Sequence, residues 1–234
     1  MKQLYQVRHY MVLKNKKVIF LLPSKTGSTA LNSLLKENNI EYKNSGYYKH
    51  PFLSEVLKSQ NIKDFYNYDI YQLCRNPIER MVSAYFFQRQ IIRNKKKYSK
   101  FFKLNFNEFV ELITSNTHLL PDHINRFCYN VFDDVDFGKS TSPTGYGVRF
   151  YLPQVKWNDT GMKVKYLKLE NLTKDCSSLS SILETNKKLS LPKVNITKKK
   201  TKKPYIEMYN KKSLDLLIDT YQEDFKILDY AYPT

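Results

Sequence analysis

Short apolar segments alternate with amphipathic segments in the first part of the chain, and each apolar segment ends at a polar turn. Residues 18–22 and 68–74 are apolar enough to be strands buried in a sheet. The helical spacing of apolar residues then predicts one helix over 28–37 and another from Pro77 to about 92. This repeated order of strand, turn and helix favours an α/β fold with a central parallel sheet.

The rest of the chain has a less regular pattern. The further elements that it predicts are helices over 51–58, 106–114, 172–184 and 213–221 and a strand over 164–169. Loops are predicted over 133–147, which is rich in Gly, Ser, Thr and Pro, and over 187–203, which is rich in lysine. We find no internal repeat and no clear linker, and therefore expect a single domain over 1–234.

The composition is that of a globular protein with an excess of basic residues. Hydrophobic residues make up 41% of the 234 positions, which excludes a disordered chain. Lys and Arg number 39 against 22 Asp and Glu, and the net charge of +17 predicts an anionic partner. Nucleic acid, an acidic polysaccharide and an anionic membrane surface all fit that charge. The 3 cysteines form no CxxC pair, so they indicate neither a zinc site nor a disulfide framework.

We expect no membrane span, because no apolar run approaches the roughly 20 residues that cross a bilayer. The first residues, Met1 to Tyr5, lack the apolar core of a signal peptide. Both observations favour a cytoplasmic or otherwise soluble protein.

The turn after the first predicted strand carries residue types that bind phosphate. Such a turn, between a buried strand and a helix N-terminus, presents unpaired backbone N–H groups and the positive end of the helix dipole. Gly27 lets the backbone approach an anion, and Lys25 adds a cation. The candidate phosphate-binding residues of this turn are Ser24, Lys25, Thr26, Gly27, Ser28 and Thr29. Because the lysine precedes the glycine, unlike in an ATP-type P-loop, an ordinary nucleotide kinase is disfavoured.

The turn after the second strand adds a second set of anion-binding groups. Arg75 follows the strand directly, and Ser83 lies on the helix that Pro77 opens. A guanidinium group and a hydroxyl suit a second phosphate. Arg80 shares a helix face with Ser83, where it either contacts the ligand or pairs with a carboxylate that holds the fold. The two turns together predict a site for a nucleotide with phosphates at two positions.

Both turns resemble motifs of the sulfotransferases that use 3′-phosphoadenosine 5′-phosphosulfate (PAPS). Lys25-Thr26-Gly27-Ser28-Thr29 is similar to their 5′-phosphosulfate loop, although Ser24 stands where the family usually has proline. The segment from Arg75 to Tyr85 is similar to their 3′-phosphate motif, R-[DN]-P-x-x-R-x-x-S-x-Y. Further segments that resemble the family are Leu152-Pro153-Gln154, Glu170-Asn171-Leu172 with Asp175, Asn195-Ile196-Thr197, and Tyr221-Gln222-Glu223-Asp224-Phe225 with Tyr230. The resemblance is closest to the Golgi-type carbohydrate sulfotransferases and their soluble microbial or viral relatives.

The resemblance implies a P-loop-like, three-layer α/β sandwich with helices on both sides of the sheet. It implies an enzyme that moves a sulfuryl group from PAPS to a hydroxyl, above all that of a carbohydrate, without a metal. Lys25 would neutralise charge on the leaving phosphate oxygen, while Arg75 and Ser83 would hold the 3′-phosphate.

The resemblance also implies a general base and a late loop near the nucleotide. His50 is the main candidate for the base, and Glu55 is a further candidate. Asn195, Thr197 and Lys198 belong to a loop that would close over the nucleotide. The lysines of that loop would alternatively recruit an acidic glycan.

Two other functions are compatible with the sequence. A basic nucleic-acid-binding module would use the net charge and the aromatic residues, but it leaves the two turns unexplained. We find no nucleic-acid motif and therefore expect no such partner. A catalytically inactive relative that binds PAPS or a glycan is the second alternative. For residues 23–29, a Ser/Thr-rich helix cap without a ligand is the simplest structural interpretation.

Overall fold

The computed structural model of the chain describes residues 10–43, 50–91, 103–117, 151–194 and 204–233. The chain divides into two compact units. The first comprises residues 1–75 and 156–196, and the second comprises 76–155 and 197–234. The single domain expected over 1–234 stays a prediction.

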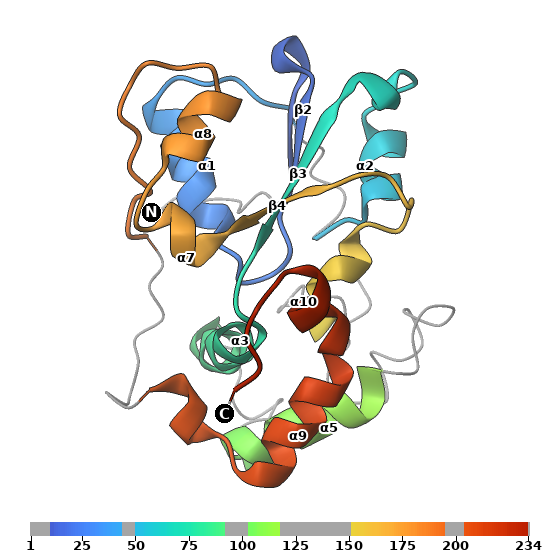
Figure 1. Cartoon of the computed structure of the whole chain (residues 1–234), viewed down its shortest axis with the longest axis vertical. Helices are drawn as coiled ribbons and strands as arrows, with labels where there is room; N and C mark the ends of the chain where they lie inside the picture. Colours follow the sequence, from blue (N-terminus) through green and yellow to red (C-terminus); the bar gives the residue numbers. More distant parts are fainter. Residues whose placement is uncertain (1–9, 44–49, 92–102, 118–150, 195–203, 234) are drawn as a thin grey trace. The chain divides into compact units, whose positions relative to one another are not determined.

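A four-stranded sheet forms the centre of the first unit (Figure 1). Its strands, in spatial order, are β1 (Tyr10–Leu13), β2 (Val18–Leu21), β3 (Asp69–Cys74) and β4 (Lys165–Lys168). β2 pairs with β3, and β3 with β4, in parallel. The strands predicted over 18–22, 68–74 and 164–169 are therefore confirmed, and so is the α/β class.

The hydrophobic pattern does not predict β1, which makes the sheet mixed rather than wholly parallel. β1 pairs with β2 in the antiparallel sense, with Leu13 opposite Val18. The two strands are joined by the 3₁₀ turn η1 (Lys14–Lys16) and Lys17. So short a connection allows a hairpin but not the crossover that a parallel pair needs. The pattern of strand, turn and helix that predicted β2 is also missing at β1, because a hairpin and no α-helix follows it.

Helices cover both faces of this sheet (Figure 1). One face carries α1 (Ser28–Glu37), α7 (Leu169–Leu172) and α8 (Ser177–Ile182), and the other carries α2 (Leu53–Ser59). Successive residues of β2 point to opposite faces, so Phe20 joins one core and Leu21 the other. The three-layer sandwich is confirmed, and α1 and α2 confirm the helices predicted over 28–37 and 51–58.

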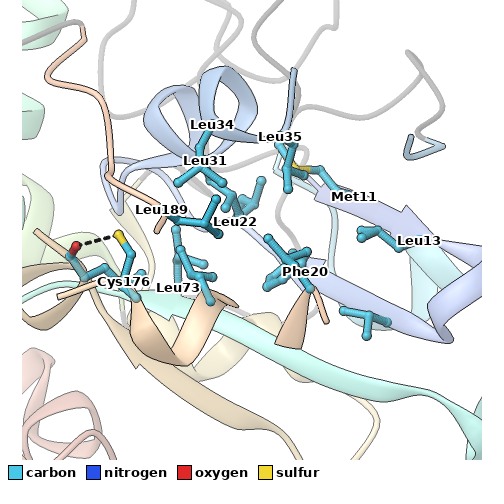
Figure 2. Close-up of a cluster of buried hydrophobic side chains, with 14 residues drawn as sticks. Met11, Leu13, Phe20, Leu22, Leu31, Leu34, Leu35, Leu73, Cys176 and Leu189 are labelled. Atoms are coloured by element: carbon cyan, nitrogen blue, oxygen red, sulfur yellow. Dashed lines mark hydrogen bonds between the residues drawn. The ribbon is translucent and has the colours of Figure 1, made fainter. Parts of the chain in front are cut away.

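The larger core of the first unit packs α1 against the sheet (Figure 2). Leu31, Leu34 and Leu35 recur at helical spacing and are each 0% exposed. Burying one such side chain stabilises the fold by about 1.5–3 kcal/mol. Cys176 lies in the same core, where its thiol donates to the backbone oxygen of Leu172 over 3.1 Å and burial raises its pKa.

The helix predicted over 172–184 is wrong in its extent: α8 covers only Ser177–Ile182, and the preceding helix α7 ends at Leu172. The Asp175 carboxylate accepts hydrogen bonds from the backbone N–H of Ser177 (2.8 Å) and from its hydroxyl (2.7 Å). These bonds, with that of the hydroxyl first, lower the pKa of Asp175. A local side-chain bond of this kind competes with the helical ladder and starts a new helix.

The second unit is helical in the residues that the structure describes. Its elements are α3 (Pro77–Ile91), α5 (Phe106–Thr117), the 3₁₀ turn η5 (Tyr205–Met208), α9 (Lys211–Thr220) and α10 (Gln222–Ile227). α5 and α9 lie side by side, and their unit has a core that includes Phe109, Leu217 and Phe225. The helices predicted from Pro77, over 106–114 and over 213–221 are confirmed, whereas α10 was not predicted.

Two further 3₁₀ turns, η2 (Phe65–Asn67) and η4 (Gln154–Trp157), complete the described elements. Across the described ranges, we find no helix with both the length and the apolar character that a membrane crossing requires.

Candidate active site

Three parallel strands of the first unit end at one edge of the sheet. β2 leads into the turn 22–27, β3 leads into Arg75, and β4 leads into Leu169 at the start of α7. The carboxyl ends of parallel strands are where ligands bind in open α/β sheets. The structure therefore brings the predicted phosphate-binding turn and Arg75 to the same edge.

The turn from Pro23 to Gly27 has an uncommon backbone conformation. Lys25 (φ 63°) and Gly27 (φ 97°) are both in the left-handed region, and Gly27 is the residue from which α1 starts. For a residue with a side chain, this conformation costs about 1–2 kcal/mol. Backbone of alternating hand turns successive N–H groups toward one point, which makes a small anion-binding concavity. The helix dipole of α1 adds a positive potential there, because its N-terminus points at this turn.

The side chains of this turn alternate between buried and more accessible positions. Ser24, Thr26 and Ser28 are buried, whereas Lys25, Gly27 and Thr29 are partly exposed. The Thr26 hydroxyl donates to the backbone oxygen of Pro23 over 2.7 Å and so closes the turn from within. The predicted contact of Thr26 with the donor stays a prediction. Lys25 and Thr29 are the side chains of the turn with a partly exposed position.

The pKa of Lys25 is strongly shifted by its surroundings in the site. Burial, with a smaller contribution from the charge of Arg75, lowers the pKa of Lys25 from 10.5 to about 7. An anion bound at this edge of the sheet would favour the charged form of the lysine. A lysine with a strongly lowered pKa is a marker of functional sites.

His50 is fixed at the same end of β2. Its Nδ1 lies 3.0 Å from the backbone oxygen of Leu22, and its side chain is only 3% exposed. A carbonyl oxygen can only accept a hydrogen bond, so the Nδ1 atom carries the proton. In the neutral ring the lone pair is then on Nε2, which is the atom that can accept a proton from a substrate.

The helix that follows His50 is anchored at its N-terminus by two carboxylates. Oε2 of Glu55 accepts the backbone N–H of Phe52 over 2.9 Å. Oδ1 of Asp159 accepts the backbone N–H of Ser54 over 2.9 Å, and Oδ2 accepts its hydroxyl over 2.5 Å. Glu55, the further candidate for the general base, therefore has a capping role in this structure.

In the second unit, Asn76 caps the start of α3. Its Oδ1 accepts the backbone N–H groups of Ile78 (3.0 Å) and Glu79 (3.4 Å), and Pro77 needs no such partner. Ser83 is a buried residue of the same helix. The expected joint action of Arg75 and Ser83 on one phosphate involves both units and stays a prediction.

Arg80 has a structural role, as one of the two predictions for this residue proposed. Its side chain is 3% exposed, and Nη1 donates to the backbone oxygen of Leu152 over 2.8 Å. Its charge also acts on Asp224: burial raises the pKa of this carboxyl, and the Arg80 guanidinium opposes that rise.

Asp224 holds the segment around Gln154 in the second unit. Oδ2 accepts the backbone N–H (2.8 Å) and the side-chain amide (3.0 Å) of Gln154, while Oδ1 accepts the N–H of Val155 (3.0 Å). The Tyr221 hydroxyl donates to the backbone oxygen of Tyr151. Two segments that are far apart in the sequence thus meet in one buried hydrogen-bond network.

Comparison with known families adds the deciding observation. A family model described as "Sulfotransferase family" matches residues 8–231. The chain belongs to the sulfotransferase family. The searches of curated proteins and of solved structures gave no match.

Some residues proposed for this sulfotransferase lie outside the described part of the chain. They are Asn195, Thr197 and Lys198 of the late loop. Within the described part, no group of His, Cys, Asp or Glu side chains is arranged to hold a metal ion. Sequence reasoning missed the anchor Asp159, and it named Asp224 only as part of a segment that resembles the family, without its role. Each carboxylate bonds a residue far away in the chain, and no local pattern indicates such a contact.

Proposed function

We propose that this member of the sulfotransferase family transfers a sulfuryl group from PAPS to a hydroxyl of a carbohydrate. The supporting observation is the turn 23–27, where Lys25 and the bare backbone of Gly27 precede α1 at the strand ends, near the charge of Arg75. A cation, an open backbone and a helix N-terminus fit the 5′-phosphosulfate end of PAPS. Bound PAPS supplies an activated sulfuryl group.

The residues of the turn are proposed to bind the donor and stabilise the charge that develops on it. Lys25 neutralises charge on the leaving phosphate oxygen, and Thr29 donates its hydroxyl to the phosphate. Backbone N–H groups at Gly27 and Ser28 complete this end of the site. The buried Ser24 and Thr26 shape the turn.

The other end of the donor is assigned by the sequence motif. Arg75 and Ser83 are proposed to hold the 3′-phosphate, the group that distinguishes PAPS from ATP. Asn195, Thr197 and Lys198 are proposed to close over the nucleotide. The support for these roles is the resemblance of the segments to sulfotransferase motifs.

His50 is proposed as the general base. Its Nδ1–H donates to the Leu22 carbonyl, so Nε2 is the ring atom that is proposed to take the proton of the acceptor hydroxyl as the sulfuryl group is transferred. The anchored N-terminus of α2 limits the movement of the adjoining His50. The net charge of +17 supports an acidic carbohydrate as the acceptor.

A binding experiment separates this proposal from its rivals. Thermal unfolding of the protein would be followed with adenosine 3′,5′-bisphosphate, ATP or a short oligonucleotide. We expect the largest stabilisation with the bisphosphate. A shift with the oligonucleotide alone would indicate a nucleic-acid-binding module and end the proposal.

Transfer of labelled sulfate from PAPS to a panel of glycans tests the activity itself. We expect His50→Ala to lower turnover by about 10²–10⁴-fold while the bisphosphate still binds. Lys25→Ala and Arg75→Ala should each lower turnover by about 10²-fold or more. Normal turnover in the His50 variant would refute the role of the base, and bisphosphate binding without transfer to any glycan would indicate an inactive relative.

A further inference from the structure

Leu169, the first residue of α7, occupies the space beside Gly27. A Cβ atom added to Gly27 would lie 2.6 Å from Cδ1 of Leu169 and 3.6 Å from its Cδ2 and Cγ. The shortest of these distances is far below van der Waals contact. The left-handed φ of 97° favours glycine at position 27, and a larger residue there would also have to displace the end of the leucine side chain.

We propose that Leu169 is a positioning residue that holds the phosphate-binding turn in its binding conformation through this contact. The inference rests on the proposed donor site, and it assigns a role to a residue outside the phosphate-binding motifs. Leu169 contacts the turn because β4 ends at the same sheet edge as β2, with β3 between them.

The leucine is itself held firmly. Its backbone oxygen accepts the N–H of Thr173 over 2.9 Å, which closes the single turn of α7. Leu172 on the same helix is 2% exposed and belongs to the core that packs α1 on the sheet. α7, which presents Leu169, is thus joined to this core through Leu172.

The turn requires such support because its own conformation is disfavoured. Lys25 adopts a left-handed φ that only surrounding contacts can maintain in a residue with a side chain. The hydrogen bond from Thr26 to Pro23 acts within the turn, and Leu169 acts on it from the neighbouring helix. Without the leucine, the turn would sample other conformations, and ordering it would weaken donor binding.

A double-mutant cycle tests the contact, with the dissociation constant of adenosine 3′,5′-bisphosphate measured by calorimetry. Gly27→Ala should weaken binding by about tenfold or more through the clash and the strain, and Leu169→Ala by about threefold through the loosened turn. The double variant should bind at least about threefold better than the product of the two effects predicts, because the smaller residue 169 removes the clash. Leu179→Ala, in the same core on α8, is the matched control, and its dissociation constant should equal that of the original protein.

The results of these measurements either support or contradict the positioning role of Leu169. Independent effects of the two substitutions, or equal weakening by Leu169→Ala and Leu179→Ala, would overturn the positioning role while the donor site stands. Failure of the unmodified protein to bind the bisphosphate would instead refute the proposed function. If Gly27→Ala does not fold by circular dichroism, the comparison of the two leucine variants alone decides the question.

Discussion

At the scale of single residues, Lys25 combines a disfavoured backbone conformation with an environment that disfavours its charged form. Its φ is 63°, and burial, followed by the charge of Arg75, lowers its pKa from 10.5 to about 7. At pH 8.5 a lysine with this pKa is mostly neutral in the ligand-free protein. A bound phosphate restores its charge, so binding of the donor must be coupled to proton uptake.

We expect the protein to take up close to one proton at Lys25 when it binds adenosine 3′,5′-bisphosphate at about pH 8.5. Affinity should accordingly fall as the pH rises above 7, by up to about tenfold per pH unit. Calorimetry in buffers of different ionisation enthalpy measures the uptake. Lys25→Met, which has no proton to gain there, is the control, and the same uptake in this variant would contradict the assignment.

Thr26 shows that the type of a residue does not by itself reveal which hydrogen bond its side chain makes. The sequence predicts a hydroxyl for the phosphate, but this hydroxyl donates to Pro23 inside the turn. Thr26→Val should lower the free energy of unfolding by about 1–3 kcal/mol, because a buried carbonyl loses its donor. Thr26→Ser keeps the hydroxyl and should lower it by clearly less. Urea unfolding measures both, and equal losses would mean that the hydrogen bond contributes nothing.

The residue types of the site could be predicted from the sequence, whereas their contacts could not. Lys25, Gly27 and Arg75 lie at turns whose chemistry is local, so the spacing reveals them. The roles of Thr26 and Arg80 depend on which carbonyl each side chain meets in the folded chain. For Arg80 that carbonyl belongs to Leu152, and no local pattern indicates it.

At the scale of elements, prediction succeeded where apolar periodicity was long or unbroken. α1 and α3 have clear start signals in Gly27 and in the Asn76-Pro77 pair, and their predicted bounds hold closely. β1 was not predicted because a hairpin, and no α-helix, follows it. The helix over 172–184 is shorter than predicted because Asp175 bonds Ser177 at the start of α8 within an apolar pattern. Side-chain hydrogen bonds to the backbone therefore account for one of the main errors.

The segment around Gln154 has no regular strand or helix to hold it beyond a 3₁₀ turn, so it depends on Asp224 of α10. Asp224→Ala should lower the free energy of unfolding by about 3–5 kcal/mol, because it leaves buried donors and the nearby Arg80 charge uncompensated. Asp224→Asn should cost less, about 1–3 kcal/mol, since one oxygen still accepts.

Urea unfolding of these variants checks the expectation. Asp215→Ala, an exposed change on α9, is the control and should stay within about 0.5 kcal/mol of the original protein. A loss at Asp224 no larger than this control would show that the network does not hold the segment.

At the scale of the whole molecule, the family match extends over residues 8–231 and thus includes residues of both units. Fold class and family could be predicted because they depend on strand order and on local turn chemistry. The acceptor could not, since no segment of the sequence resembles a known acceptor-binding element. The net charge of +17 is the one global property that bears on it.

Salt dependence tests whether this charge serves the acceptor. If the basic surface attracts an acidic glycan, raising the salt concentration from about 0.05 to 0.5 M should raise its KM several-fold, because the Debye length falls from roughly 14 to 4 Å. The KM of a neutral glycan with the same reactive hydroxyl should change little, which makes it the matched control. Steady-state sulfate transfer at saturating PAPS measures both values. An equal rise for the two glycans would place the salt effect on the donor site or on the fold, and the lysine excess would then have no part in choosing the acceptor.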